Sequence, residues 1–304
     1  MAEGPTRVTS ATKLPLRHTL LLGLVQGPTE VLPVSSSAHI ALLPRLAGWP
    51  HAQQDAELRN SLEVALHAGT AAALLAYSGM LAATGMLAGG ECPPASAKRV
   101  SPESAALRGE LEQALRGLDG RALGSAALAL APPALVGYLM EQRLERRPSG
   151  PRALAAGLAV GAAAMAWADT RPEARSLAGF DPGDSFALGL AQALALLPGI
   201  SRNGATLTAA RARGFTRADA QALSWRVGLP VIVGAVGLKA FRLAQRGVPP
   251  GAAPALAVGT GAAFLSTLAC APLIRPGSRA RALWPFALYR AGLALAAVAS
   301  SGSA

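Results

Sequence analysis

Stretches without Asp, Glu, Lys or Arg follow one another along most of the chain, separated by short charged connections. A bilayer core needs roughly 20 mostly apolar residues per helix. Three brief stretches, at 18–29, 31–44 and 227–238, are typical of half-helices or of parts of longer spans. The longer stretches cover residues 64–90, 122–140, 153–168, 185–201, 247–274 and 291–304. The pattern predicts an all-α, polytopic membrane helical bundle.

Composition supports this prediction. Of the 304 residues, 51% are hydrophobic and 15% are charged, whereas soluble domains carry charge on about a quarter of their residues. The net charge of +11 does not indicate a nucleic-acid partner, because few aromatic residues lie among the scattered basic residues. Positive loops beside membrane spans explain them better. The loops do not alternate cleanly in charge, so charge alone leaves the orientation open.

Proline and glycine interrupt the apolar pattern at residues 27–33 and 198–204. Irregular backbone at membrane depth must be buried in protein or line a wet cavity. The two places align, since GLVQ at 23–26 matches GLAQ at 189–192, and a proline turn with serine follows each copy. Paired broken segments in corresponding halves indicate a binding site at the repeat interface. Chance similarity is the alternative.

The two copies lie about half the chain apart. We therefore expect a single membrane domain, residues 1–304, with repeat halves at roughly 14–140 and 151–302. Residues 91–121, between the halves, mix proline, serine and both charge signs. This composition is typical of an extramembrane connection.

Ionisable residues at membrane depth cost about 2.5 to 3.5 kcal/mol on insertion scales and are functional candidates. Glu30 and His39 lie in the first broken segment, and Arg202 lies in the second. If the repeats pack together, an acid, an imidazole and a guanidinium converge. Gln26 and Glu30 are four residues apart, so on a helix both can reach one ion or water. A polar helix end at the membrane interface is the alternative reading of this pair.

The sequence SSSAH at 35–39 places serine hydroxyls within one helical turn of His39. Such an arrangement can supply a nucleophile, here Ser36, and a proton carrier. Serine runs are also ordinary helix caps, so the motif alone is weak evidence.

The second broken segment reads PGISRNGAT at 198–206. Glycines let backbone amides turn toward an anion, Ser201 and Thr206 add hydroxyl groups, and Arg202 adds a planar fork suited to phosphate. The segment therefore predicts a phosphate cradle. It is not a P-loop, because no Gly-Lys-Ser/Thr follows. An arginine that extends to the membrane interface is the alternative.

Both motifs match one known family. GLVQGPTEVLPVSSSAH at 23–39 and PGISRNGAT at 198–206 resemble the bacterial undecaprenyl-diphosphate phosphatase family, of the bacitracin-resistance type. LEVALHAGT at 62–70 and WRVGLPVIVGA at 225–235 resemble further stretches of the same family. The match covers most of the membrane portion in the right order.

The resemblance implies hydrolysis of undecaprenyl diphosphate to the monophosphate, which returns the lipid carrier to cell-wall peptidoglycan synthesis. It also implies a bundle of inverted repeats with re-entrant helices in the bacterial plasma membrane, with its site facing outside. Members are often homodimers and need a divalent cation, Mg²⁺ or Ca²⁺.

Carried over by position, the resemblance gives catalytic roles to Glu30, Ser36, His39 and Arg202. It gives substrate binding to Ser35, Ser201, Asn203 and Thr206, and metal binding to Gln26 and Glu30. Three positions depart from the common pattern: Gln26 where Glu is frequent, Ala38 where Gly is common, and Asn203 where Ser is usual. With one carboxylate fewer, we expect weaker metal affinity.

Two points stay open on the sequence. Ser36 or an activated water can attack the terminal phosphorus. A transporter that flips undecaprenyl phosphate without hydrolysis is the competing function, because inverted repeats with broken helices are also transporter architecture. A structural membrane protein without a ligand leaves Glu30, His39 and Arg202 unexplained.

Overall fold

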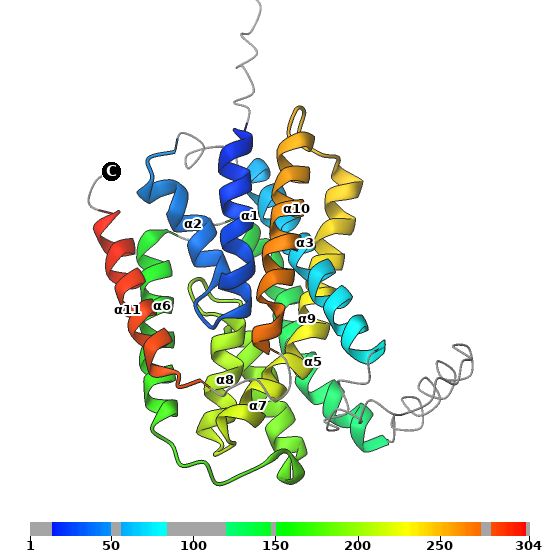
Figure 1. Ribbon diagram of the computed structural model, residues 1–304, viewed down its shortest axis with the longest axis vertical. Helices are drawn as coiled ribbons and strands as arrows, with labels where there is room; N and C mark the ends of the chain where they lie inside the picture. Colours follow the sequence, from blue (N-terminus) through cyan, green and yellow to red (C-terminus); the bar gives the residue numbers. More distant parts are fainter. Residues whose placement is uncertain (1–13, 50–55, 84–119, 147–149, 275–280, 302–304) are drawn as a thin grey trace, which may run out of the picture.

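The computed structural model describes residues 14–49, 56–83, 120–146, 150–274 and 281–301. Over these residues the chain forms ten α-helices and two short 3₁₀ segments. The α-helices are α1 (Leu16–Val31), α2 (Ser36–Leu46), α3 (Ala56–Ala83), α5 (Gly120–Arg146), α6 (Pro151–Asp169), α7 (Pro182–Leu194), α8 (Arg202–Ala212), α9 (Arg217–Arg246), α10 (Ala253–Cys270) and α11 (Trp284–Ala299). They form one bundle (Figure 1), so the prediction of an all-α fold is confirmed.

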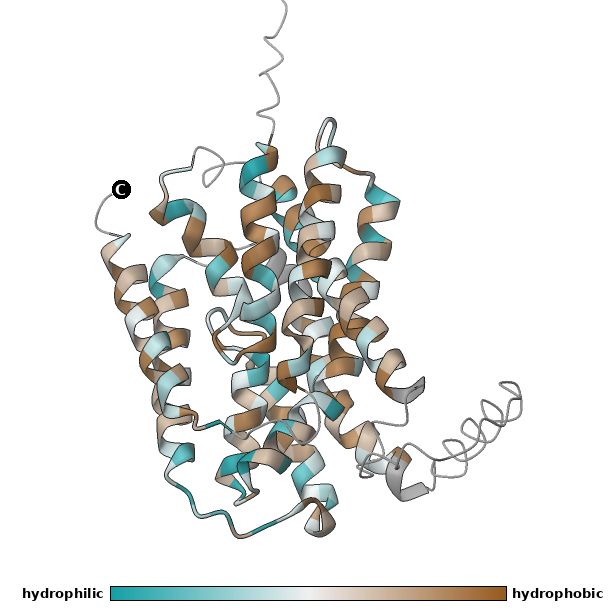
Figure 2. Ribbon diagram, viewed as in Figure 1, coloured by the Kyte–Doolittle hydropathy of each residue, from teal (hydrophilic) through white to brown (hydrophobic). Residues whose placement is uncertain are grey.

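Four helical segments of the described chain are long and apolar enough to cross a membrane: Glu57–Leu81, Pro151–Asp169, Arg217–Arg246 and Ala253–Ile274. Shorter apolar helices cover Leu123–Leu139 and Trp284–Ala299. The chain is thus a multi-pass membrane protein. Large apolar side chains face outward on these helices, Leu265 and Leu295 among them, as expected for surfaces that meet lipid. Figure 2 shows that the connection between α6 and α7 is mostly hydrophilic.

Four short helices, α1, α2, α7 and α8, form two helical hairpins. Figure 1 shows the α1–α2 hairpin in the upper half of the bundle and the α7–α8 hairpin in the lower half. The apolar stretch 185–201 is not one continuous helix, because α7 ends at Leu194 and a turn with Pro198 and Gly199 follows. Gly199 has φ +84°, a conformation that only glycine adopts without strain.

Glycine lets α1 lie close against α10. A Cβ at Gly23 would come within 2.6 Å of the Ala262 Cβ. Ser266 Oγ donates to the Gly23 carbonyl at 2.8 Å and accepts from the Gly27 N–H at 3.2 Å. Small residues that admit a second backbone and hydrogen bonds across helices are typical of membrane helix pairs. In the same way, α7 packs against α5 at Gly189.

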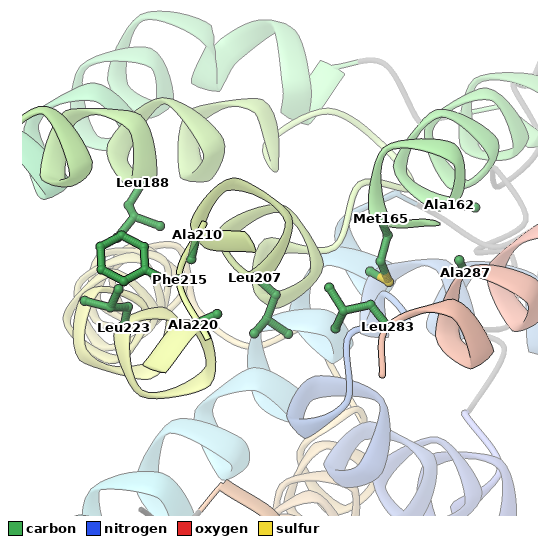
Figure 3. Close-up of a cluster of buried hydrophobic side chains, with 10 residues drawn as sticks. All are labelled: Ala162, Met165, Leu188, Leu207, Ala210, Phe215, Ala220, Leu223, Leu283 and Ala287. Atoms are coloured by element: carbon green, nitrogen blue, oxygen red, sulfur yellow. The ribbon is translucent and has the colours of Figure 1, made fainter. Parts of the chain in front are cut away.

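A buried apolar cluster joins α6, α7, α8, α9 and α11 (Figure 3). Phe215, in the turn between α8 and α9, lies between Leu188 of α7 and Leu223 of α9 in this view. The members of the buried cluster are Ala162, Met165, Leu188, Leu207, Ala210, Phe215, Ala220, Leu223, Leu283 and Ala287. Because interiors are close-packed, the cluster fixes the position of α8, the helix that begins at Arg202.

Ion pairs stabilise the second hairpin where α7 begins and α8 ends. Arg175 donates to both Asp184 carboxylate oxygens, at 2.9 and 2.8 Å, and Arg213 bonds to the same carboxylate. Asp181 and Asp184 form a reciprocal cap at the start of α7. Burial alone would raise the pKa of the Asp184 carboxyl, but its bonds to Arg175 and Arg213 hold that pKa below its ordinary value.

Candidate active site

The two hairpins meet at a cluster of polar side chains. Glu30, in the last turn of α1, accepts a hydrogen bond from Ser36 Oγ at 2.6 Å. Its other oxygen lies 3.2 Å from Arg202 Nη2, which comes from the second hairpin. His67 Nε2 of α3 lies 3.7 Å from Glu30 Oε2. A carboxylate, a hydroxyl, a guanidinium and an imidazole therefore share one place.

Local structure explains why Ser36 and Arg202 point to this place. Each is the first residue of a short helix that follows a turn. Ser35, which precedes α2, has φ +75° and is buried, and Ser201 caps α8 by accepting from the Gly204 N–H at 3.1 Å. Free N–H groups and the helix dipole make such helix starts favourable for anions.

The Arg202 guanidinium is fixed by α9. It lies over the Trp225 ring, 5.3 Å from the ring centroid, a cation–π contact. Gly228, one turn later, leaves space for it, because a Cβ there would overlap the guanidinium. Trp225 and Gly228 thus hold the Arg202 guanidinium in place.

A cavity of about 220 Å³ opens beside the cluster. Ligand pockets for drug-sized molecules are usually larger, about 300–1,000 Å³, so this one suits a small group rather than a long lipid chain. Its polar lining carries both charge signs and several hydroxyls. The polar residues are Thr29, Glu30, Ser35, Ser36, Ser37, Glu63, His67, Ser201, Arg202, Asn203 and Lys239.

Six of the nine residues proposed from sequence line this cavity: Glu30, Ser35, Ser36, Ser201, Arg202 and Asn203. The other three do not. Thr206 is fully buried and bonds to the Arg202 and Asn203 carbonyls and to Ser224 Oγ. It therefore holds the first turn of α8 together.

His39, which we expected to converge with Glu30 and Arg202, does not line this cavity. Its Nδ1 lies 2.7 Å from the Ser35 carbonyl and its Nε2 lies 2.7 Å from the Tyr289 hydroxyl. The His39 ring therefore contacts α11. The imidazole near Glu30 is that of His67.

Gln26 also lies apart from the cavity. It is fully buried, and its side-chain amide has no hydrogen-bond partner among the described residues. Gln26 and Glu30 lie four residues apart on α1, but only Glu30 lines the cavity.

Comparison with known proteins identifies the family. A sequence model of the bacitracin resistance protein BacA matches residues 19–296. The chain belongs to the BacA family. Relatives of this family include an undecaprenyl-diphosphatase of Geobacter metallireducens, 35% identical over 282 residues, covering 90% of this chain and 93% of the relative. The undecaprenyl-diphosphatase of Pelobacter propionicus is 35% identical over 292 residues, which cover 94% and 98% of the two chains.

In this BacA family member, three further ionisable residues line the cavity that sequence reasoning did not select: Glu63, His67 and Lys239. His67 lies inside the stretch 64–90, which contains no Asp, Glu, Lys or Arg, and a pattern of these four residue types does not reveal a histidine. Its Nδ1 lies 2.8 Å from the Glu63 carbonyl, which orients Nε2 toward Glu30. Glu63 and Lys239 lie 4.0 Å apart and are partly exposed.

Asn203 joins the two hairpins directly. Its amide donates to the Val31 carbonyl at 2.9 Å, and its oxygen accepts from Ser224 Oγ at 2.8 Å. Ser224 Oγ is also 2.5 Å from Thr206 Oγ1. Asparagine has both a donor and an acceptor, so it can bond α1 and α9 at once, and the side chain acts here as a bridge as well as a lining group.

Proposed function

We propose that this chain hydrolyses undecaprenyl diphosphate to undecaprenyl phosphate and inorganic phosphate, which recycles the cell-wall lipid carrier and gives bacitracin resistance. The observation that carries the proposal is the Glu30–Ser36–Arg202 cluster where two helix starts meet. The identity of the substrate is inferred from membership in a family whose relatives are undecaprenyl-diphosphatases. The cavity suits the diphosphate headgroup, and the lipid chain would lie outside it.

In the mechanism that we propose, Arg202, Ser201 and the start of α8 hold the terminal phosphate. Ser36 Oγ attacks its phosphorus and gives its proton to Glu30, which already accepts that hydrogen bond at 2.6 Å. The phosphoanhydride bond breaks and undecaprenyl phosphate leaves as an anion. Water then attacks the phosphorus of the phosphoserine, the P–Oγ bond breaks as Glu30 returns its proton to Ser36 Oγ, and the proton of the water leaves with inorganic phosphate. This bond to Glu30 favours Ser36 over direct attack by water.

The proton-carrier role expected of His39 has no support in its contacts. His67 is better placed, because its Nε2 faces the Glu30 carboxylate that receives the Ser36 proton. We propose that His67 stabilises Glu30 during proton transfer and that His39 holds the Ser35 turn. Stabilisation of phosphate charge by Arg202 should lower the barrier more than proton transfer does, as is usual for phosphoryl transfer.

The proposal includes a divalent cation, Mg²⁺ or Ca²⁺. Among the described residues no three His, Cys, Asp or Glu side chains could hold a metal by themselves. Mg²⁺ is commonly bound by one or two carboxylates together with substrate phosphates and water, and Glu30 offers such a carboxylate. The cation would neutralise charge on the phosphates. Gln26 takes no part, since its side chain does not line the cavity.

We also propose that the fold is an inverted repeat with two re-entrant hairpins. The support is the corresponding packing of α1 on α10 and of α7 on α5, through Gly23 and Gly189 of the repeated motif. The hairpins lie in opposite halves of the bundle (Figure 1). A homodimer, with the site open to the outside of the plasma membrane, rests on the family resemblance. Light scattering in detergent tests the dimer, and labelling of Ser37→Cys by an impermeant thiol reagent tests the orientation.

A flippase for undecaprenyl phosphate is the second candidate. One observation favours it: Asn203 lines the main cavity and also a second, smaller one of about 30 Å³, whose lining includes Pro33, Arg217 and Phe286. A bridge between two cavities is what a transporter would open. Phosphate release by detergent-solubilised protein decides between the candidates. We expect cation-dependent release from undecaprenyl diphosphate, and a pure transporter releases none.

A further inference from the structure

One buried arginine contacts the turns of both hairpins. Arg290 of α11 is 1% exposed. Its Nη2 donates to the Gly199 carbonyl at 3.1 Å, and its Nη1 lies 3.5 Å from the Pro33 carbonyl. Its Nη2 is also 3.5 Å from the Gly157 carbonyl of α6. The guanidinium therefore connects the turn of each hairpin to the α6–α11 pair.

The surroundings are built to hold this group. A Cβ at Gly161 of α6 would overlap the guanidinium, and one at Gly204 of α8 would lie 3.2 Å from Nη1. No carboxylate forms an ion pair with Arg290 in the described part of the chain, and its Nε has no hydrogen-bond partner there. A buried charge without a counter-ion is costly. A residue that served packing alone would not need the charge.

The positions of its two turn contacts suggest the reason. Pro33 lies three residues before Ser36, and Gly199 lies three residues before Arg202. Both carbonyls belong to turns, where no helix ladder binds them. One rigid, planar donor group that binds both turns fixes how far the proposed nucleophile lies from the proposed phosphate ligand.

We propose that Arg290 is a positioning residue for the reaction, which sets the distance between Ser36 and Arg202 through the Pro33 and Gly199 carbonyls. It touches no reacting atom. The inference rests on the proposed hydrolase function. A displacement of about 1 Å between reacting groups can cost on the order of a hundredfold in rate. Lysine keeps the charge at this position but cannot bind two carbonyls with a planar fork.

The test compares Arg290→Lys with Arg211→Lys in the full-length, detergent-solubilised chain. Arg211 is the matched control: it is also 1% exposed and also donates to two backbone carbonyls, those of Arg171 and Phe215, and it lies at the opposite end of α8 from Arg202. Turnover is expressed per binding-competent molecule, counted by calorimetric titration with non-hydrolysable methylenediphosphonate. This normalisation removes losses that come only from misfolded protein.

For Arg290→Lys we expect kcat to fall about 30- to 100-fold, while KM and the Kd for methylenediphosphonate stay within about threefold of wild type, because Arg202 and the start of α8 remain. For Arg211→Lys we expect kcat per binding-competent molecule within about threefold of wild type. If the two variants lose turnover equally, or if Arg290→Lys loses affinity as much as turnover, the inference is overturned.

If Arg290→Lys does not fold, Gly161→Ala displaces the guanidinium without removing any polar group, and the same loss of kcat is expected. Unchanged kcat in Gly161→Ala would then overturn the inference. The wild-type chain separates this test from that of the function. A wild type that releases no phosphate overturns the hydrolase proposal, whereas an active wild type with an active Gly161→Ala variant overturns the role of Arg290 alone.

Discussion

Arg202 Nη2 lies 3.2 Å from Glu30 Oε1, although 172 residues separate the two in the chain. Both side chains are nearly buried, with 13% and 10% exposure. Removal of one partner from a buried ion pair leaves an uncompensated charge, which is more costly than loss of a surface pair. Substitutions at this pair should therefore affect both activity and stability.

Glu30→Gln keeps the shape of the side chain and removes the carboxylate that accepts the Ser36 hydrogen bond. We expect cation-dependent phosphate release to fall at least a hundredfold, while the protein still inserts into the membrane. Release is measured on purified protein across a series of Mg²⁺ concentrations. Glu57→Gln, at the exposed start of α3, serves as the control. Activity of Glu30→Gln within about threefold of wild type would contradict the role of Glu30.

Arg202→Lys keeps the charge but loses the planar fork and the seat on Trp225 and Gly228. We expect kcat to fall about ten- to a hundredfold, as for the loss of a hydrogen bond to a charged group worth about 1.5–3 kcal/mol. The loss should fall on kcat more than on KM if the contact strengthens in the transition state. Arg45→Lys, exposed in the last turn of α2, should be nearly neutral. Equal kinetics for both variants would exclude Arg202 as the phosphate ligand.

Ser36→Ala tests the nucleophile. If Ser36 forms the covalent intermediate, turnover should fall by about a thousandfold or more, since removal of a nucleophile leaves only binding and charge stabilisation. Ser37→Ala, next in the chain and exposed, should lose much less. Steady-state phosphate release measures both. A Ser36→Ala variant that retains a tenth of wild-type turnover would favour attack by water.

The sequence predicted the broken segments because proline, glycine and polar residues inside apolar stretches leave few other readings in lipid. It also predicted that Glu30 and Arg202 meet, because both lie in repeated segments. Periodicity failed for Gln26, since two residues can share a helix face while only one reaches the cavity. Thr206 resembled a ligand but satisfies backbone carbonyls within α8.

Contacts between helices that are distant in the chain could not be predicted from the sequence. The position of α3 against α1 determines that His67, and not His39, faces Glu30. Arg290 borders the charge-free stretch 291–304 and therefore resembles an ordinary flanking residue. Its burial follows from the packing of α11 on α6, which no local pattern encodes.

Asp184 should make the stability of the second hairpin depend on pH. Its pKa in the folded protein lies below the ordinary value, because of its bonds to Arg175 and Arg213. A lowered folded pKa gives stability that is present above the unfolded pKa, roughly 4, and is lost as pH falls through the folded value. We expect the thermal unfolding midpoint in detergent to drop at acidic pH in wild type. In Asp184→Asn it should be lower at neutral pH and change less with acidification. Parallel curves for the two proteins would contradict this linkage.

Two histidines, His67 of α3 and His39 of α2, lie near the first hairpin and have different contacts. His67→Ala removes the imidazole 3.7 Å from Glu30, and we expect kcat to fall about a hundredfold, in the range typical of groups that assist proton transfer. His39→Ala removes the contacts with the Ser35 carbonyl and Tyr289. That change should lower the thermal unfolding midpoint and cost less in turnover per folded molecule. Tyr289→Phe, half exposed on α11, is the matched control for the His39 side and should stay within about threefold of wild type. A larger loss of turnover in His39→Ala than in His67→Ala would mean that the His39 ring turns toward Glu30 when substrate binds, and the role assigned to His67 would be wrong.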